Sequence, residues 1–389
     1  MADETEPSAH RTGSKSPTEP GSSPPGNEAP LEAGDNSADD GDSAFGSEPA
    51  SSTTSITSSI LEYRTVHGRR YHSDRGDAAY WAPNDEQQNE SMDINHHQLT
   101  LVLGGKLYLS PLKQDIQRVL DIGTGTGIWA MYERASHETG ENANLSYSDF
   151  ADEFPNAEVT GTDISVIQPQ WVPPNLKFEI EDCTQTWTFD ENSIDYVHMR
   201  YLIGSIKDWP ALMKEAFRVC KPGGYVESYE GSPDMESDDD TVPKDSAMAD
   251  WGPIFKEAGA KISRPFTILH EDLARKAMEE AGFVDIESRD FKAPVGAWPK
   301  DKNMRQIGQF AQVALEQDIE GYVLGVAGLA RGWSKDEVAV YCAKLRQEIR
   351  SLKQHAYYRI RVVYGRKPEN IAVTEIEVLG VFTWDTRYG

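Results

Sequence analysis

Apolar and polar positions alternate with two different periods through the middle of the chain, which predicts an α/β fold. Four short apolar runs end at or near a charged residue, and a helical repeat is followed by a Pro-Gly-Gly turn and a fifth run. Strands that alternate with helices are typical of a mainly parallel sheet. The predicted strands lie at 118–121, 158–163, 176–182, 193–200 and after the turn at 221–224, with the helix at 209–219.

The second half of the chain has mostly helical spacing, with two further strands. Gly282 follows a helical run in the manner of a C-cap, and the alternation at 283–291 predicts a strand. Ser334 and Glu337 form a capping box that opens another helix. A last strand is predicted at 362–364, and helices at 247–260, 269–281 and 303–330.

Composition divides the chain into four segments. Residues 1–58 are rich in Ser, Pro, Gly and acidic residues and nearly lack large apolar side chains, so we expect a disordered acidic tail. The alternative is a regulatory or partner-binding segment, because Ser and Thr are abundant there. Aromatic residues and a helical repeat predict a helical N-terminal cap at 59–111, then the main domain at 112–370 and a C-terminal tail at 371–389.

The acidic composition excludes several classes of function. With 389 residues and a formal charge of -26, the chain would repel phosphate backbones and anionic membranes, so we expect no direct nucleic-acid contact. No apolar run is long enough to span a bilayer, and no apolar signal segment opens the sequence. Three cysteines without metal-ligand spacing fit a reducing compartment, so we expect a cytoplasmic or nuclear protein without a metal site.

A glycine-rich turn carries the strongest chemical signal. Asp121 ends the first predicted strand, and Gly123, Gly125 and Gly127 alternate with Thr124 and another threonine before a helix begins. Glycines let the backbone turn sharply and approach a ligand closely, and a helix N-terminus offers free N–H groups. A lone G-x-G is weak evidence, so the strands that follow decide what this turn binds.

The next two predicted strands also end in acids. Asp163, followed by Ile164, ends the second strand, and a carboxylate there suits the two hydroxyl groups of a ribose. Asp182, followed by Cys183, ends the third strand, where an adenine amino group could be bound. The series therefore predicts a nucleoside site along one edge of the sheet.

These residues resemble the class I S-adenosylmethionine-dependent methyltransferases. The resemblance rests on the blocks at 121–127 and 221–224 together with Asp163 and Asp182. It implies S-adenosyl-L-methionine as cofactor and a Rossmann-like, seven-stranded, mostly parallel sheet with helices on both faces. The last two strands would then be those at 283–291 and 362–364. Nicotinamide enzymes favour G-x-G-x-x-G, and no Lys-Ser/Thr follows the glycines as a P-loop requires.

A closer resemblance is to the fungal LaeA-like methyltransferases. This family includes nuclear regulators of secondary metabolism, some of which work with velvet-domain partners, and enzymes of natural-product clusters. The resemblance implies the fold and the cofactor, and leaves open whether the acceptor is a small molecule or a protein. It is carried by short blocks at 63–64, 68–71, 83–86, 96–97, 105–109, 127–129, 168–175, 198–200 and 364–368.

Further candidates lie after the fourth strand and in the cap. Met199 and Arg200 are expected to line the pocket, with a structural ion pair as the alternative for Arg200. His198 could act as a general base or could simply be packed. Tyr71 could belong to a lid over the cofactor, or to a surface contact.

Three other sets of residues are expected to be structural. Glu227 and Glu230 end the fifth strand, and we expect them to be solvated or structural rather than catalytic. The pair His96-His97 lacks the spacing of a third ligand that a metal site would need. Trp129 is expected to contribute to packing.

Residues 132–148 look foreign to the domain. They are polar and separate strand ends that would otherwise be 25 rather than 42 residues apart. Without them, Ala130, Phe150, Ala151 and Phe154 fall on one face of a single helix. We hypothesise a retained intron of 51 bases, since the codons for Met131-Tyr132 and Ser148 can carry the splice signals. The alternative is a genuine surface loop.

Three hypotheses for function follow. The first is a methyltransferase acting on a small molecule of fungal secondary metabolism. The second is a regulator of the LaeA type that acts in the nucleus through protein partners. The third is a catalytically dead product, if residues 132–148 interrupt the cofactor helix. No Asn/Asp-Pro-Pro-Tyr motif follows the fourth strand, which disfavours methylation of exocyclic amines.

Overall fold

A seven-stranded sheet forms the centre of the molecule. The computed structural model describes residues 63–72, 80–131 and 149–369, so the predicted tails at 1–58 and 371–389 and the segment at 132–148 lie outside the described residues. The strand order is β5-β4-β3-β6-β7-β9-β8, and only β9 runs antiparallel to its neighbours, which confirms the predicted sheet. The strands are β3 (Arg118–Ile122), β4 (Glu158–Asp163), β5 (Leu176–Ile180), β6 (Ile194–Arg200), β7 (Cys220–Gly231), β8 (Val284–Pro294) and β9 (Tyr357–Arg366).

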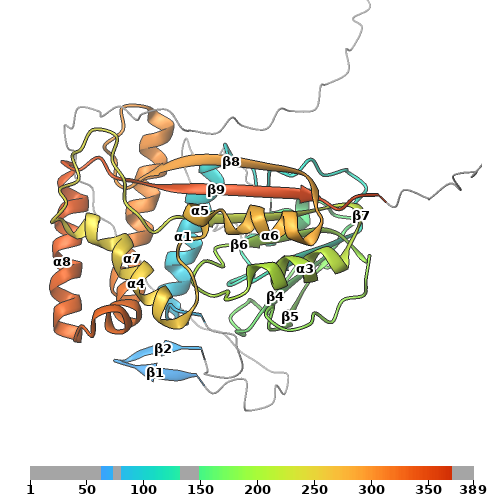
Figure 1. The fold of residues 1–389 in the computed structure, drawn as a ribbon, viewed down its shortest axis with the longest axis horizontal. Coiled ribbons are helices and arrows are strands. Elements are labelled where there is room, and N and C mark those ends of the chain that lie inside the picture. Colours follow the sequence, from blue (N-terminus) through green and yellow to red (C-terminus); the bar gives the residue numbers. More distant parts are fainter. Residues whose placement is uncertain (1–62, 73–79, 132–148, 370–389) are drawn as a thin grey trace, which may run out of the picture.

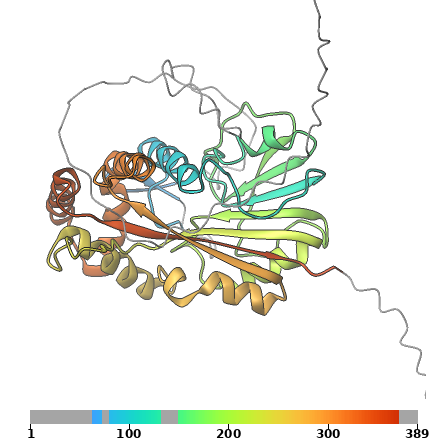
Figure 2. The same cartoon turned by 90° about the horizontal axis from the view of Figure 1, so that it is seen from above.

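Helices cover both faces of this sheet, as Figures 1 and 2 show. Helices α3 and α6 pack together over one face, and α1 and α7 pack together over the other. Helices α4, α7 and α8 gather beyond one end of the sheet, at the left of Figure 1. The helices are α1 (Glu86–Val102), α2 (Phe150–Glu153), α3 (Trp209–Val219), α4 (Ala247–Ile262), α5 (Ile268–Glu271), α6 (Leu273–Ala281), α7 (Lys302–Arg331) and α8 (Lys335–Ser351).

The N-terminal cap is not helical throughout, contrary to the prediction for 59–111. Its described residues, 63–72 and 80–111, form an antiparallel hairpin of β1 (Arg64–Val66) and β2 (Arg69–Tyr71) and one helix, α1. Both residues of the connecting turn, His67 and Gly68, have positive φ, at 51° and 85°. Two positive φ values fit the primed turns that match the twist of paired strands, which explains why this segment is a hairpin.

Arg69 fastens the hairpin to two helices. Its guanidinium forms paired hydrogen bonds of 2.6–2.7 Å with Asp85, the N-cap of α1, and with Asp318 in the middle of α7. Asp318 is buried and has non-helical φ and ψ of -148° and 46°, so α7 is kinked at this point. The cap, α1 and the kink of α7 are therefore held together by one cation.

The helix predicted directly after the glycine turn is reduced to hydrogen-bonded turns, and residues 132–148 separate these turns from the short helix α2. Met131 N–H donates to Gly127 O at 2.9 Å, and α2 is only four residues long. Two bonds cross the interruption: Phe150 N–H donates to the carbonyl of Trp129, and Ala151 N–H to that of Ala130. Without the 17 intervening residues, both bonds would join residues four positions apart, as in an α-helix. The flanks thus retain the hydrogen bonds of one continuous helix.

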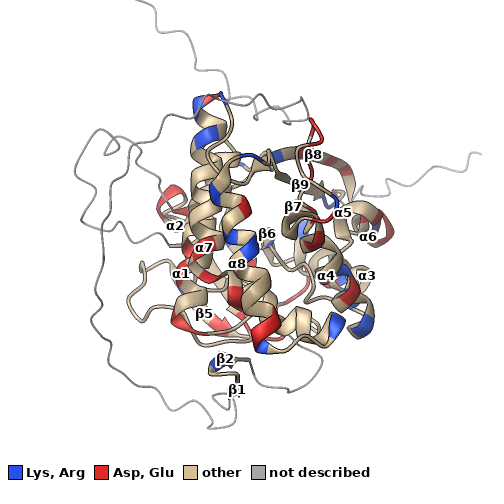
Figure 3. Cartoon of the chain, turned by 90° about the vertical axis from the view of Figure 1, so that its left-hand side faces the viewer, with Lys and Arg blue, Asp and Glu red and all other residues tan. Residues whose placement is uncertain are grey.

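The surface is mixed in charge over the helical end. Figure 3 shows acidic and basic segments interspersed along α7 and α8. Arg350 pairs there with Glu316, and Arg346 with Glu320. None of the helices in the described part of the chain is both long and apolar enough to cross a membrane.

Candidate functional site

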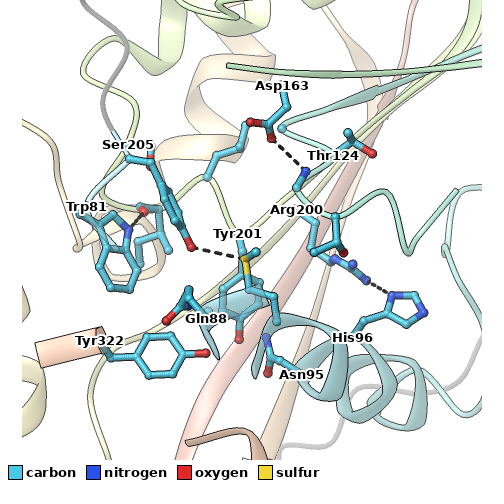
Figure 4. Close-up of a pocket in the computed structure, with 18 of the residues that line it drawn as sticks. Trp81, Gln88, Asn95, His96, Thr124, Asp163, Arg200, Tyr201, Ser205 and Tyr322 are labelled. Atoms are coloured by element: carbon cyan, nitrogen blue, oxygen red, sulfur yellow. Dashed lines mark hydrogen bonds between the residues drawn. The ribbon is translucent and has the colours of Figure 1, made fainter. Parts of the chain in front are cut away.

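A pocket of about 270 Å³ opens at the carboxyl ends of the parallel strands. Ligands of open α/β sheets bind at this edge, because the loops that follow neighbouring strands converge there. The loops after β3, β4, β5 and β6 form one side of the pocket, and residues of α1, α4 and α7 form the other. Figure 4 shows Asp163 and Thr124 on one side and Trp81 and Tyr322 on another.

The glycine turn forms one wall with its backbone. Gly123 and Gly125 have φ values of 68° and 60°, which side chains rarely adopt. A Cβ added at Gly123 would lie 2.5 Å from the side chain of Leu202, whereas at Gly125 only Met92 comes within 4 Å. Thr124 caps the turn by donating to Asp121 Oδ2 at 2.6 Å. The turn therefore leaves open space beside Gly125 for a ligand.

Asp163 lies between the turn and the next loop. Its two carboxylate oxygens accept hydrogen bonds of 2.9 Å from the backbone N–H groups of Gly125 and Ser165. Burial raises the pKa of this carboxyl to about 6, although these hydrogen bonds oppose the shift. The carboxylate is held rigidly at the pocket, with lone pairs left for hydroxyl donors.

Asp182 lines the pocket one strand further out. Its Oδ1 accepts from both the N–H and the hydroxyl of Thr184, at 2.9 and 2.6 Å. Its neighbour Cys183 also lines the pocket, and burial raises the pKa of this thiol to about 12. The thiol is therefore not a nucleophile near neutral pH.

Asp121 and His198 form a buried pair behind the glycine turn. His198 Nδ1 lies 2.7 Å from Asp121 Oδ1, and its ring stacks on Trp129 at 3.9 Å between centroids. The His198 side chain has no exposed surface, and its Nε2 has no hydrogen-bond partner in the described part of the chain. Trp129 is buried, as expected, yet it also lines the pocket beside this pair.

Arg200 projects into the pocket from the end of β6. Its Nη1 donates to Nδ1 of His96 at 3.0 Å (Figure 4), and no described carboxylate forms an ion pair with it. Burial, followed by the positive charge of Arg200, holds the pKa of His96 well below its usual range. His96 is therefore a neutral acceptor, and the pair carries one positive charge.

Ten of the thirteen predicted site residues meet at this pocket. Gly127, Met199 and Tyr71 do not line it. Gly127 packs on Phe178, where an added Cβ would lie 2.4 Å from the ring. Met199 has no exposed surface and belongs to the core, and the buried Tyr71 lies near Gly325 of α7. The ten are Asp121, Gly123, Thr124, Gly125, Asp163, Ile164, Asp182, Cys183, His198 and Arg200.

Glu227 and Glu230 are structural rather than solvated. Glu227 accepts from the N–H groups of Leu109 and Ser110, and Glu230 from those of Leu202 and Ile203, at 2.7–3.1 Å. Both side chains are buried, and burial raises the pKa of Glu230 to about 8. Glu230 thereby fixes the loop after β6 that lines the pocket.

Sequence reasoning missed the aromatic wall of the pocket. Trp81 lies at its centre, with its ring 5.3–6.2 Å from the rings of Phe255, Phe266 and Tyr322. Trp251 stands next to Phe255, one helical turn earlier on α4. The spacing of Trp251 and Phe255 indicated a shared helix face, but nothing in the sequence showed that it faces the glycine turn. We call these five residues the aromatic chamber.

A family model and similar proteins also indicate a methyltransferase, as the fold and the glycine turn do. A family model described as a methyltransferase domain matches residues 94–288. The methyltransferase pytC of Aspergillus terreus is 36% identical over 318 residues, which are 82% of this chain and 92% of that protein.

Two further relatives are also similar over most of their length. The secondary metabolism regulator LAE1 of Cochliobolus heterostrophus is 32% identical, over 78% of this chain and 94% of that protein. The protein-methionine methyltransferase laeA of Emericella nidulans is 28% identical, over 83% of this chain and 81% of that protein. The fold, the family model and these relatives confirm the resemblance seen in the sequence: the chain belongs to the fungal LaeA-like branch of the class I methyltransferases.

Proposed function

We propose that the protein binds S-adenosyl-L-methionine in this pocket and methylates a small molecule of fungal secondary metabolism. The observation that carries the proposal is the alignment of Asp163 and Asp182 beside a glycine turn with open space at Gly125. Two held carboxylates suit ribose hydroxyls and an adenine amino group, as in other nucleoside sites. The likeness to a protein named as a methyltransferase, pytC, supports methyl transfer as the reaction.

The residues present fit this cofactor. Gly125 has only Met92 within 4 Å of an added Cβ, so the backbone is free to meet a ligand. Asp163 would hold the ribose, Asp182 and the backbone at Cys183 the adenine, and Asp121 with the turn the amino-acid end. When bound, S-adenosylmethionine would supply an electrophilic methyl group on a positive sulfur. The protein would contribute mainly alignment and exclusion of water, worth about 7–11 kcal/mol.

His198 is best explained as a positioning residue. Its Nδ1 holds Asp121, while the packing on Trp129 fixes the plane of the ring. A general-base role would require Nε2 to reach the acceptor, and the side chain has no exposed surface. His198→Asn should therefore weaken cofactor binding through Asp121. A base would instead leave binding intact and lower kcat in a pH-dependent way.

The direct test is methyl transfer to natural metabolites. Purified protein and S-adenosylmethionine with a labelled methyl group would be added to extracts of a strain from which the gene is deleted. We expect label to enter a metabolite that accumulates in that strain. If no small molecule is labelled while a protein in the extract is, the small-molecule acceptor is wrong.

A second candidate is a nuclear regulator that acts through protein partners. The likeness to LAE1 and to laeA, whose name states protein-methionine methylation, favours it. Co-purification of a velvet-type partner with the tagged chain would support this function. A catalytically dead chain is a third candidate, and tight cofactor binding by the full chain would reject it. The cytoplasm and the nucleus are the compartments that fit these functions.

A further inference from the structure

Arg200 is a partly exposed cation that lines the pocket and forms no ion pair with a described carboxylate. In the described part of the chain its hydrogen-bond partner is the neutral His96. The carboxylates of Asp121 and Asp93 act on the charge of Arg200 from beyond ion-pair distance, so the guanidinium can still take up a directly bound anion. Its free N–H groups line the pocket. An anionic group of a ligand in the pocket can therefore reach the guanidinium directly.

The order of the strands places Arg200 beyond the cofactor residues. Along the edge of the sheet, Asp182 follows β5, Asp163 ends β4, Asp121 lies in β3 and Arg200 ends β6, and these four strands are neighbours in that order. The first three residues are those that suit a nucleoside and its amino-acid end. Arg200 comes one strand later, on the side where an acceptor would enter.

The wall facing this region is apolar and aromatic. Trp81 and Tyr322 of the aromatic chamber lie on the side of the pocket opposite Arg200 (Figure 4). The small residues Ala311 and Ala314 of α7 also line the pocket. Trp81 is fixed there because its indole N–H donates to the carbonyl of Ile203 at 2.9 Å. Such a wall suits a flat carbon skeleton rather than a chain of polar groups.

The buried amide of Gln88 is a second indication that a ligand occupies the part of the pocket between Arg200 and the aromatic chamber. The side chain is completely buried and lines the pocket beside Tyr322; its amide lies near the hydroxyls of Tyr80 and Tyr322 but forms no hydrogen bond of regular geometry in the described residues. The hydroxyl of Tyr322 is already paired with Ser91 at 2.7 Å. Unpaired buried amides are costly, so a polar group of the ligand is expected near Gln88.

We propose that the methyl acceptor is an apolar, ring-containing molecule with an anionic oxygen, a carboxylate or an acidic enolate, which Arg200 binds while the aromatic chamber holds the rings. This inference rests on the proposed function and narrows its acceptor. The oxyanion forms the new O–C bond with the methyl carbon as the C–S bond breaks and its electron pair passes to sulfur. No proton remains to be removed, which agrees with the absence of exposed surface on His198.

The test uses the full chain saturated with S-adenosylhomocysteine and two matched probes, 2-naphthoate and 2-naphthamide. Calorimetry should show naphthoate binding about tenfold or more tightly, as expected for a charge-assisted contact. Arg200→Met should abolish this preference, and Arg200→Lys should retain part of it. Arg346→Met removes the same charge from the surface pair with Glu320 and should change nothing.

The same variants show whether the anion that Arg200 binds belongs to the acceptor or to the cofactor. S-adenosylhomocysteine carries a carboxylate, and 5′-methylthioadenosine lacks one. If Arg200→Met weakens only S-adenosylhomocysteine, Arg200 serves the cofactor and the inference is wrong. Equal binding of naphthoate and naphthamide to the wild type would also overturn it. A wild type that does not bind S-adenosylhomocysteine would contradict the proposed function itself.

Discussion

The chemistry of this protein depends on a few residues whose environments differ sharply. Asp163 is held by two backbone N–H groups, and burial raises its pKa to about 6. Asp121 is held by Thr124 and His198. Among the described residues, Arg200 has the neutral His96 as its hydrogen-bond partner and forms no ion pair with a carboxylate. These differences indicate that Arg200 and Asp163 can still bind a ligand, whereas the hydrogen bonds of Asp121 are already made within the protein.

Cofactor binding should weaken in mild acid because of Asp163. Only the ionised carboxylate can accept hydrogen bonds from both ribose hydroxyls, and it is protonated as the pH falls through about 6. We expect the Kd for S-adenosylhomocysteine to rise about tenfold per pH unit below that value. Asp163→Asn should bind weakly at every pH, without this slope. Calorimetry between pH 5 and 8 would measure both, and a flat wild-type profile would contradict the role of Asp163.

Gly123 and Gly104 offer a matched pair of glycines. Both have positive φ, at 68° and 67°, but an added Cβ meets nothing within 4 Å at Gly104 and meets Leu202 at 2.5 Å at Gly123. Gly104→Ala should cost about 1 kcal/mol of unfolding free energy and leave ligand binding unchanged. Gly123→Ala should also push Leu202 into the pocket and weaken S-adenosylhomocysteine binding. If the two variants lose the same unfolding free energy and bind S-adenosylhomocysteine equally well, the close contact between Gly123 and Leu202 is unimportant.

At the scale of elements, one arginine joins the hairpin to the wall of the pocket. Asp318 has no exposed side-chain surface, and its partners are Arg69 and the N–H of Gly321. Arg69→Met should lower the unfolding free energy by about 3–5 kcal/mol, because it leaves a buried charge unpaired. The double variant with Asp318→Asn should recover part of this loss.

An exposed ion pair serves as the control for that measurement. Arg350 is 62% exposed where it meets Glu316, so Arg350→Met should cost less than about 1 kcal/mol in the same denaturation experiment. If Arg69→Met and Arg350→Met cost the same, the buried contact does not fasten the cap.

The interrupted helix makes a prediction about residues 132–148. Removing them would convert the bonds from Phe150 and Ala151 into regular helical bonds, so the shortened chain should be at least as stable and should bind S-adenosylhomocysteine as tightly. Removing 132–147 instead would turn Phe150 by about 100° off its buried face and should destabilise the domain. Thermal unfolding compares the two. If every transcript read contains the 51 bases, the retained-intron hypothesis is wrong.

For the whole molecule, the sequence predicted the sheet well, and ten of the thirteen candidate residues line one pocket. The acids at successive strand ends and the alternating glycines are local signals, and each lies where a strand meets a loop. The hairpin at 64–71 was missed because its strands are only three residues long. The aromatic chamber was missed because Trp81, Trp251 and Tyr322 come together only through packing of distant segments. Tyr71 was expected in a lid over the cofactor, but its buried side chain lies near Gly325 of α7 and does not line the pocket, because nothing in the sequence shows which way this side chain points.

The most direct test of the central claim is calorimetric binding of S-adenosylhomocysteine to the full chain at pH 7.5, beside Asp163→Ala and the surface variant Arg350→Met. We predict saturable binding at one site to the wild type and to Arg350→Met. In Asp163→Ala we predict a loss of about tenfold or more, as expected when a charge-assisted hydrogen bond is removed. Unchanged affinity in Asp163→Ala, or no binding by the wild type, would contradict the assignment of this pocket to the methyl donor.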